Sequence, residues 1–218
     1  MENKEKPPER WLFIMNIDIT KLKGQYVYLR ELNSEDIPVL RVLAKDERLW
    51  EFTKTLLIDE TFDEQFEKYI DVAFNPNGDG SYSAGLQKTF VIFRVIDDKI
   101  IGMTRFYGID EKQKRLDIGY TWYIPEVWGL IYNKECKLLL LQYTFEILMY
   151  NRVGFHVAHQ NIRSQKAVAK IGGVKEGILR NHSYRADGSI RHTVLFSIVK
   201  EEWPEKKKQL LELIASEK

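Results

Sequence analysis

The residues that decide the fold are Leu116-Asp117-Ile118-Gly119-Tyr120-Thr121-Trp122-Tyr123-Ile124-Pro125-Glu126-Val127-Trp128-Gly129-Leu130-Ile131-Tyr132-Asn133-Lys134. The first nine are rich in β-branched and aromatic side chains, as strands are, and Pro125 ends the strand because proline cannot donate to a ladder. Asn133 is a preferred helix N-cap, and nothing from Lys134 to Met149 breaks a helix. The stretch therefore predicts a strand, a loop and a helix in direct succession.

A loop that enters a helix directly after a strand can bind a diphosphate, because helix N-termini carry unpaired N–H groups and the positive end of the peptide dipoles. Such units occur in every α/β protein, so this one alone is weak evidence. The continuation adds specificity. Residues 152–159 read as a second strand, and Asn161-Ile162-Arg163-Ser164 opens a helix from Gln165 to Ile171 that Gly172-Gly173 ends.

Five short motifs follow one another along this region. They are Asp117-Ile118-Gly119-Tyr120-Thr121-Trp122, Trp128-Gly129, Asn133-x-Glu135-x-Lys137, Asn161-x-x-Ser164-x-x-Ala167 and Glu176-Gly177-x-Leu179-Arg180. In this order they resemble the GCN5-related N-acetyltransferases (the GNAT family), and within it the RimJ/RimL-like branch that acetylates protein N-termini. The resemblance implies an N-terminal extension (1–23), an acetyltransferase domain (24–203) and a C-terminal amphipathic helix (204–218).

The rest of the chain predicts a matching scaffold. Strands are expected at 26–32, 89–96, 100–108, 116–124, 152–159, 177–184 and 193–199, with helices after Asn33-Ser34 and from Thr61, where Glu64 completes a capping box. This succession predicts an α/β fold with a central mixed, mostly antiparallel sheet and helices on both faces, which is the GNAT fold that the resemblance implies. The Gly- and Asn-rich segment 75–85 is predicted to be a long loop, either bordering the acceptor site or disordered.

The C-terminal tail, from Glu201 to Lys218, predicts an amphipathic helix with Trp203, Leu210, Leu211 and Ile214 on one side. Packing on its own domain is the simpler role for this apolar side. Self-association into a homodimer is the alternative.

Composition limits the possible partners and compartment. With 33 basic and 32 acidic residues the net charge is +1, so no global field drives the protein to nucleic acid or to an anionic membrane. No apolar run reaches the roughly 20 residues that a membrane helix needs. The single Cys136 excludes an internal disulfide framework, which suits a reducing compartment and predicts a cytoplasmic protein. His156 and His159 fall on opposite faces of a strand without a clear carboxylate partner, so no metal site is expected.

The resemblance also implies where acetyl-CoA, the co-substrate, binds. Its diphosphate would face the backbone amides of the loop and first helical turn, and its pantetheine arm would lie between the third meander strand and the next strand. The cofactor-binding residues implied in this way are Ile124, Trp128, Gly129, Leu130, Ile131, Tyr132, Asn133, Lys134, Asn161 and Ser164. Asn161 could serve as a helix cap, as a partner of the pantetheine amides, or as both.

Three side chains are the candidates for catalysis. Ser164 lies in the first turn of a helix, where the dipole favours an anion, and is assigned to protonate the departing thiolate. His182 has a suitable intrinsic pKa for the base, and Asp117 stands where family members commonly have glutamate. Glu176 is a further candidate for the base, and Ser164 and His182 also have purely structural interpretations.

The sequence does not decide which amine accepts the acetyl group. The alternatives are a ribosomal or other protein N-terminus, a free amino acid, a polyamine and an aminoglycoside. An α-amine, with a pKa near 8, is partly neutral at pH 7 and asks less of a base than lysine does. Polycationic acceptors would need an acidic cleft, for which Asp59, Glu60, Asp63, Glu64 and Asp79 are available if they converge.

Ile131 is a departure from the family pattern, which usually has a second glycine at this position. A β-branched residue permits neither positive φ nor close approach of a phosphate easily. Together with the lack of a carboxylate beside His182, this supports a second hypothesis, a catalytically degenerate module of the same fold that acts through acyl-CoA or protein binding.

Overall fold

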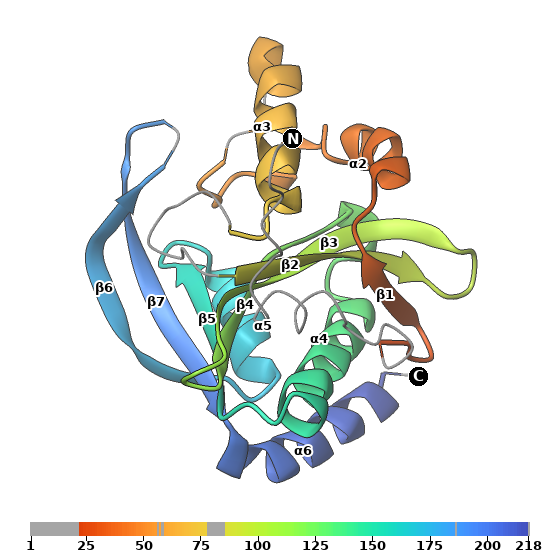
Figure 1. The fold of residues 1–218 in the computed structure, drawn as a ribbon, viewed down its shortest axis with the longest axis vertical. Helices are drawn as coiled ribbons and strands as arrows, with labels where there is room; N and C mark the ends of the chain where they lie inside the picture. The colour runs from red at the N-terminus through yellow and green to blue at the C-terminus, as the bar shows by residue number, and fades with distance from the viewer. Residues whose placement is uncertain (1–21, 56, 58, 78–85, 186, 218) are drawn as a thin grey trace, which may run out of the picture.

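The computed structural model describes residues 22–217 except 56, 58, 78–85 and 186. Seven strands form one sheet in the order β1-β2-β3-β4-β5-β7-β6 (Figure 1). They are β1 (Val27–Glu31), β2 (Leu86–Arg94), β3 (Lys99–Asp110), β4 (Arg115–Tyr123), β5 (Arg152–Ala158), β6 (Val174–Tyr184) and β7 (Ile190–Val199). Strands β4 and β5 pair in parallel and the other described neighbours pair antiparallel, which confirms the mixed, mostly antiparallel sheet.

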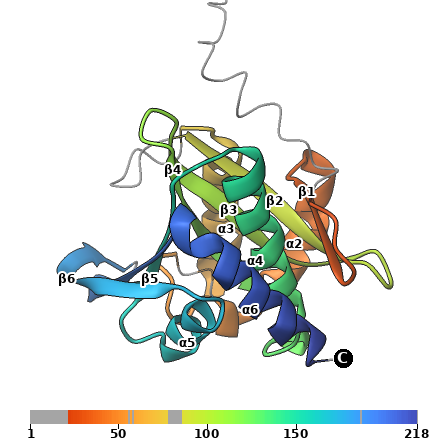
Figure 2. The ribbon, with the colours of Figure 1, turned by 90° about the horizontal axis from the view of Figure 1, so that it is seen from below.

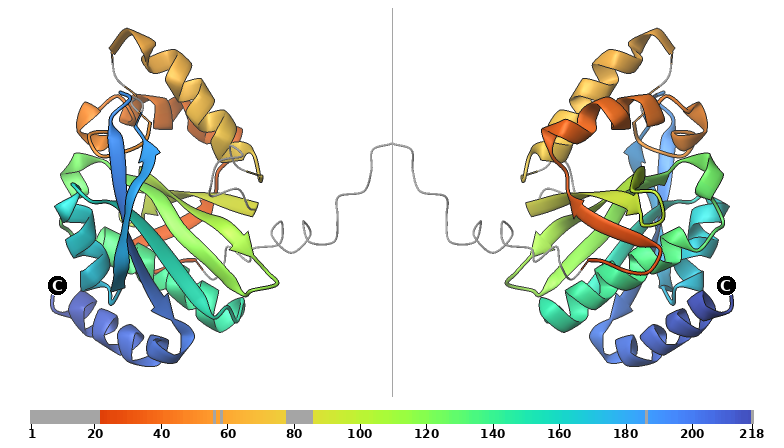
Figure 3. Two further views of the ribbon diagram at one scale, coloured as in Figure 1. Left: turned by 90° about the vertical axis from the view of Figure 1, so that its left-hand side faces the viewer. Right: turned by 90° about the vertical axis from the view of Figure 1, so that its right-hand side faces the viewer.

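Helices cover both faces of this sheet, as predicted (Figure 3). One face packs against α2 (Ile37–Leu43) and α3 (Phe62–Phe74), and the other against α4 (Tyr132–Gln142), α5 (Ile162–Lys170) and α6 (Trp203–Ala215). Strand β2 shows why: Phe90 and Ile92 are buried on the α4 side, whereas Val91 and Phe93 are buried on the α3 side. Side chains alternate across a strand, so a strand buried along its whole length needs cover on both faces.

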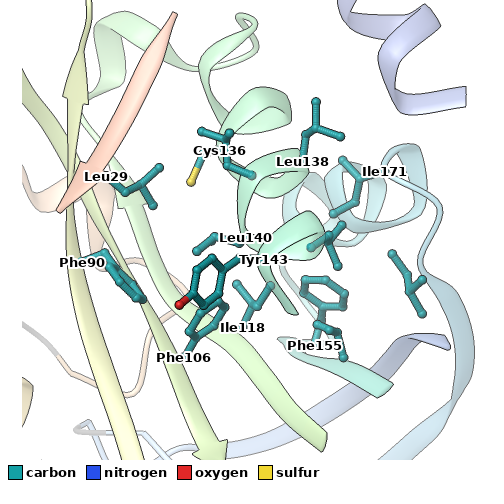
Figure 4. Packing of buried hydrophobic residues seen from close by; sticks show 14 of the residues in the cluster. Leu29, Phe90, Phe106, Ile118, Cys136, Leu138, Leu140, Tyr143, Phe155 and Ile171 are labelled. Carbon is teal, nitrogen blue, oxygen red and sulfur yellow. The ribbon is translucent and has the colours of Figure 1, made fainter. Parts of the chain in front are cut away.

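The larger core lies between the sheet and α4 (Figure 4). Leu138 and Leu140 of α4 are buried there with Phe106 and Ile118 of the sheet, and Ile171 closes the core after α5. The four-leucine run of the sequence is thus core packing. It holds the start of α4 in a fixed position beside the end of β4.

Helix α6 belongs to the same core. Trp203, Leu210 and Ile214 are buried in it, and α6 lies across α4 (Figure 2). Leu211, predicted on the same side, is 46% exposed instead, because successive residues on a helix point about 100° apart. The simpler sequence interpretation, packing on the helix's own domain, therefore describes this segment. The described part of the chain contains no helix with the length and apolar character that crossing a bilayer requires.

Several local predictions were wrong in detail. Helix α4 begins at Tyr132, so Asn133 lies inside its first turn and forms no cap. Beyond Gln142 the helix widens into a π-helical turn, Tyr143–Ile147, instead of continuing regularly to Met149. Thr61 is the N-cap residue of α3, but its side chain makes no capping hydrogen bond, so the predicted capping box is absent. Residues 1–21 of the predicted extension and most of the 75–85 loop lie outside the described residues.

Candidate active site

A cleft opens where β4 and β5 separate. The two strands pair only over Arg115–Arg152, Leu116–Val153 and Asp117–Gly154, although β4 continues to Tyr123 and β5 to Ala158. Beyond these pairs, residues of both strands line one cavity of about 360 Å³. Separated strands leave backbone N–H and C=O groups without ladder partners along the cleft, and an extended ligand with amides can use them.

The backbone at the end of β4 faces the cleft one residue earlier than predicted. The amide of Ile124 donates to Ile101 O on β3, 2.9 Å away, and is therefore directed away from the cleft. Tyr123 O instead accepts a 2.7 Å hydrogen bond from Trp128 Nε1. Because consecutive residues of a strand direct their backbone groups to opposite edges, Tyr123 replaces Ile124 as the residue with a cleft-facing backbone.

The loop between β4 and α4 presents unused amides at the helix start. Gly129 has φ +77°, and a Cβ built on it would meet nothing within 4 Å, so its surroundings are open. Among the described residues, the amides of Gly129, Ile131, Tyr132 and Asn133 have no hydrogen-bond acceptor. Helix-start amides of this kind carry the partial positive charge that anions bind, so the loop fits a diphosphate.

Ile131 occupies ordinary helical backbone, with φ −64° and ψ −27°. Its β-branched side chain is therefore unstrained and packs, half-buried, against the core. The loop therefore does not need the positive φ that a glycine at position 131 would permit.

The side chains of Lys134 and Glu135 stabilise the loop and helix start. Lys134 Nζ donates to Leu130 O and forms an ion pair with Glu217 at 2.7 Å, and its amide donates to Ile131 O at 3.0 Å. Lys134 thus has internal partners for both its amide and its ammonium group. The Glu135 carboxylate accepts three hydrogen bonds from backbone amides at the start of β1, which ties that segment to the first turn of α4.

Asn161 and Ser164 lie together on the opposite wall of the cavity. Asn161 is the N-cap of α5, and its Oδ1 accepts a 2.9 Å hydrogen bond from the amide of Ser164. The capping role predicted for Asn161 is confirmed, and its side-chain amide group is still available as a donor. Both residues line the cavity.

Trp128 connects the two walls. The guanidinium of Arg163 lies over the Trp128 ring, 3.8 Å from its centroid, and that of Arg48 lies 5.9 Å from the same centroid. Neither arginine was singled out in the sequence, where no local pattern marks them. Their positive charges stand beside the loop whose amides are unused, which adds to its attraction for phosphate groups.

Asp117 and His156 form a pair that the sequence analysis missed. Asp117 Oδ2 lies 3.8 Å from His156 Nε2, although His156 was predicted to have no carboxylate partner. Burial raises the pKa of Asp117 to about 6, against the influence of Arg152 and Arg115. Burial also lowers the pKa of His156, helped by the nearby Arg191. His156 lines the cavity, and Asp117 stands behind it, outside the described lining.

His182 reaches the cavity through a bulge in β6, where Asn181 has φ 50° and the pairing with β7 shifts. Its Nδ1 lies 2.9 Å from Thr193 Oγ1. Its pKa is lowered by burial and by the charge of Lys54, which favours the neutral ring. Arg180 and Tyr184, two residues to either side of His182 on this strand, are exposed.

Glu176 is bound elsewhere. It pairs with Arg152 at 2.7 Å and accepts from Ser197 Oγ at 2.8 Å, and the Arg152 hydrogen bond is the main reason that its pKa falls to about 2. Such a carboxylate is a weak base.

The structure brings six of the sequence-predicted site residues to the cavity. Trp128, Gly129, Asn133, Asn161, Ser164 and His182 line it. The others, Asp117, Ile124, Leu130, Ile131, Tyr132 and Lys134, lie outside its described lining, although several border it along the chain. Within the described residues, no group of three or more His, Cys, Asp or Glu side chains is arranged to hold a metal ion.

Comparison with known proteins agrees with this geometry. Residues 27–174 match the family model described as an acetyltransferase (GNAT) domain, and the chain belongs to this family. Membership of this family supports an acyl-CoA co-substrate.

Two relatives come from Bacillus subtilis strain 168. YoaA, named as an uncharacterized N-acetyltransferase, is 34% identical over 102 residues, which are 47% of this chain and 56% of YoaA. YdaF, whose name proposes a ribosomal N-acetyltransferase, is 32% identical over 108 residues, which are 49% of this chain and 57% of YdaF. The chain therefore spans little more than half the length of these curated relatives.

Solved structures share the fold. A GCN5-related N-acetyltransferase from Brucella melitensis superposes with a TM-score of 0.76 at 24% identity, over 88% of this chain and 84% of that one. Spermidine N-acetyltransferase from Vibrio cholerae, in complex with CoA and spermine, gives 0.65 at 19% identity, over 83% of this chain and 99% of that one. At these identities the likeness establishes the fold alone.

Proposed function

We propose that the protein is an N-acetyltransferase that transfers an acetyl group from acetyl-CoA to a primary amine by direct attack in a ternary complex. The observation that carries this proposal is one cavity that joins the unused amides at the start of α4 to two histidines whose lowered pKa favours the neutral ring. The first feature suits a diphosphate, and the second suits a group that must remove a proton from an amine.

Acetyl-CoA, when bound, would supply an acetyl group activated as a thioester. Gly129 and the amides of Ile131, Tyr132 and Asn133 would hold the diphosphate, and Asn161 would orient the arm with its side-chain amide. We assign His182 and His156 to accept the amine proton at a ring nitrogen, with Asp117 behind His156 favouring its charged form across 3.8 Å. Ser164, in the first turn of α5, would donate a proton to the leaving sulfur.

For the acceptor we propose a protein or peptide N-terminal α-amine, as in the RimJ/RimL-like branch. Three considerations support it: the motif order, the ribosomal N-acetyltransferase name of YdaF, and the lower basicity of an α-amine relative to lysine. A polyamine, the acceptor named for the Vibrio cholerae structure, is less suited. Asp59, Glu60, Asp63 and Glu64 are absent from the described lining, and Asp79 lies outside the described residues. A cytoplasmic location follows from the same acceptor class and from the single, buried Cys136.

The degenerate-module hypothesis loses one of its two supports. Ile131 has an unstrained helical backbone and leaves the neighbouring amides unused. The other support, the lack of a carboxylate at His182, is offset by Asp117 beside His156. We therefore keep the proposal that the protein is an active N-acetyltransferase.

The experiment is a turnover screen with acetyl-CoA over peptide N-termini, free amino acids and polyamines, read as release of free thiol. Calorimetry with acetyl-CoA accompanies it, with Gly129→Trp as the variant, because an indole at this open position would fill the diphosphate site. Thiol release with at least one α-amine, and binding abolished by Gly129→Trp, are the expected results. No binding at millimolar acetyl-CoA would refute the proposal.

A further inference from the structure

The charged side chains in the described lining of the cavity are all of one sign. Its described lining contains five cationic residues, Arg48, Lys54, Lys137, Arg163 and Arg191, and no aspartate or glutamate. Arg48 and Arg163 sit on Trp128 beside the proposed diphosphate site, and Arg48 also pairs with Asp46. Diphosphate binding can therefore account for these two. It does not account for Arg191, which lies on β7 and bonds to Thr193, the residue that also contacts His182.

Arg191 is a buried guanidinium that has no charged partner among the described residues. It is 8% exposed, and its one side-chain hydrogen bond in the described structure is from Nη1 to Thr193 Oγ1, 3.0 Å away. Its Nε is buried and has no acceptor. Burial lowers the pKa of Arg191, as expected where no carboxylate offsets the cost of desolvation. An arginine keeps such an environment at a cost to folding, so a ligand that completes it is the natural explanation.

Arg191 stands beside the proposed catalytic groups. Thr193 Oγ1, which accepts from Arg191, also lies 2.9 Å from His182 Nδ1, so a single hydroxyl positions both side chains. The charge of Arg191 is also one reason for the lowered pKa of His156. An anionic group held by Arg191 would therefore lie next to the two rings assigned to receive the amine proton.

We infer that Arg191 binds a carboxylate of the acceptor, so that the substrate is an amine that also carries a carboxylate close to the amine in space. The inference rests on the proposed acetyl transfer and narrows its acceptor class. Two sources supply this chemistry: the α-carboxylate of a free amino acid, and an acidic side chain at the first or second position of a peptide. The guanidinium fork matches a carboxylate in two parallel hydrogen bonds, whereas a polycation would meet repulsion from the same wall.

The test uses acceptors that differ only in this charge. Leucine is compared with leucinamide, and a tetrapeptide with glutamate at its second position is compared with the glutamine peptide, for wild type and Arg191→Met. The ratio of variant to wild-type kcat/KM cancels differences in amine basicity between acceptors. We expect Arg191→Met to lower kcat/KM at least about tenfold for one or both carboxylate acceptors, mainly through KM, and less than about threefold for the amides. The pair that shows the loss identifies the source of the carboxylate.

Equal losses for charged and neutral acceptors would overturn the inference. Arg180→Met is the matched control, since Arg180 is exposed on the adjacent strand β6, and it should leave both ratios unchanged. Arg191→Met should fold, because it removes a buried charge without leaving a charged partner behind; a melting temperature no lower than wild type verifies this. Arg191→Lys keeps the charge but loses the fork, and should fall between wild type and Arg191→Met for the carboxylate acceptors.

A binding measurement tests the role of Arg191 even if the protein does not transfer acetyl groups. If no acceptor releases thiol, calorimetric binding of N-acetylglutamate, with N-acetylglutaminamide as the neutral control, tests Arg191 directly. Binding of N-acetylglutamate at least about tenfold tighter to wild type than to Arg191→Met supports the carboxylate site without acetyl transfer. No binding to wild type, or equal binding to both proteins, would overturn it.

Discussion

Glu135→Gln tests how the first turn of α4 is held in place. Glu135 Oε1 accepts from Gln25 N at 2.8 Å, and Oε2 accepts from Tyr26 N at 2.6 Å and Val27 N at 2.7 Å. Gly24 makes this approach possible, because a Cβ there would lie 2.5 Å from the Glu135 carboxyl carbon. The first turn of α4, which carries the unused amides, is thus tied to the start of the sheet by one carboxylate.

The magnitude follows from counting these bonds. Three charge-assisted hydrogen bonds contribute roughly 2 kcal/mol each, whereas glutamine can keep two neutral ones at roughly 1 kcal/mol each, with its NH₂ turned toward the exposed Gln25. Glu135→Gln should therefore lower the free energy of unfolding by about 4 kcal/mol, and the melting temperature by about 10 °C for a domain of this size.

Urea unfolding followed by circular dichroism measures the effect, with Glu212→Gln as the control because Glu212 is exposed on α6. A loss below about 1 kcal/mol for Glu135→Gln, with the control neutral, would refute the reasoning, since surface substitutions commonly fall within about 0.5 kcal/mol.

Three further outcomes are expected. Asp117→Asn tests the carboxyl group whose pKa burial raises to about 6. Because its pKa is raised, this carboxyl stabilises the folded state below about pH 4 and loses that effect as the pH rises through 6. In urea unfolding, the free energy of unfolding of the variant relative to wild type should therefore increase by up to about 3 kcal/mol between pH 4 and pH 7. A difference in this free energy that does not change with pH would contradict the reasoning. Ser164→Ala should lower turnover by at least about tenfold while calorimetry shows CoA binding little changed, and near wild-type turnover would remove Ser164 from the mechanism. Lys137 is buried, its ammonium has only the hydroxyls of Thr121 (2.9 Å) and Thr104 (3.4 Å) as partners among the described residues, and burial lowers its pKa. Lys137→Met should therefore raise the melting temperature at pH 7 and raise it less at pH 10. A lower melting temperature at pH 7 would show that other contacts stabilise the buried ammonium.

The sequence by itself determined the elements and their order. Pro125 ended β4 within two residues of the predicted position, and Gly172-Gly173 followed α5 as expected, because proline and glycine restrict or free the backbone of the residue they occupy. Asn161 was also correctly assigned as a helix cap, because a cap is a contact between residues only three positions apart in the sequence. Motif order then led to the GNAT family and to the general position of the cleft.

Contacts between distant residues were decided by the tertiary structure. Asp117 and His156 are 39 positions apart and meet because β4 and β5 pair in parallel just below the point where they separate. Helix α4 begins at Tyr132 instead of after Asn133, with the preceding Trp128 ring fixed to Tyr123 O across the loop. Propensity cannot encode such a bond.

The proposed role of Arg191 likewise could not be predicted from the sequence. In the sequence it is one of 33 basic residues in a chain of almost zero net charge, and nothing local distinguishes it. Only the folded sheet buries it beside Thr193, His182 and His156, because its effect depends on which charges are absent around it. Hydrophobic pattern and turn residues are local and can be read along the chain, whereas desolvation and charge pairing depend on every element that packs around a group.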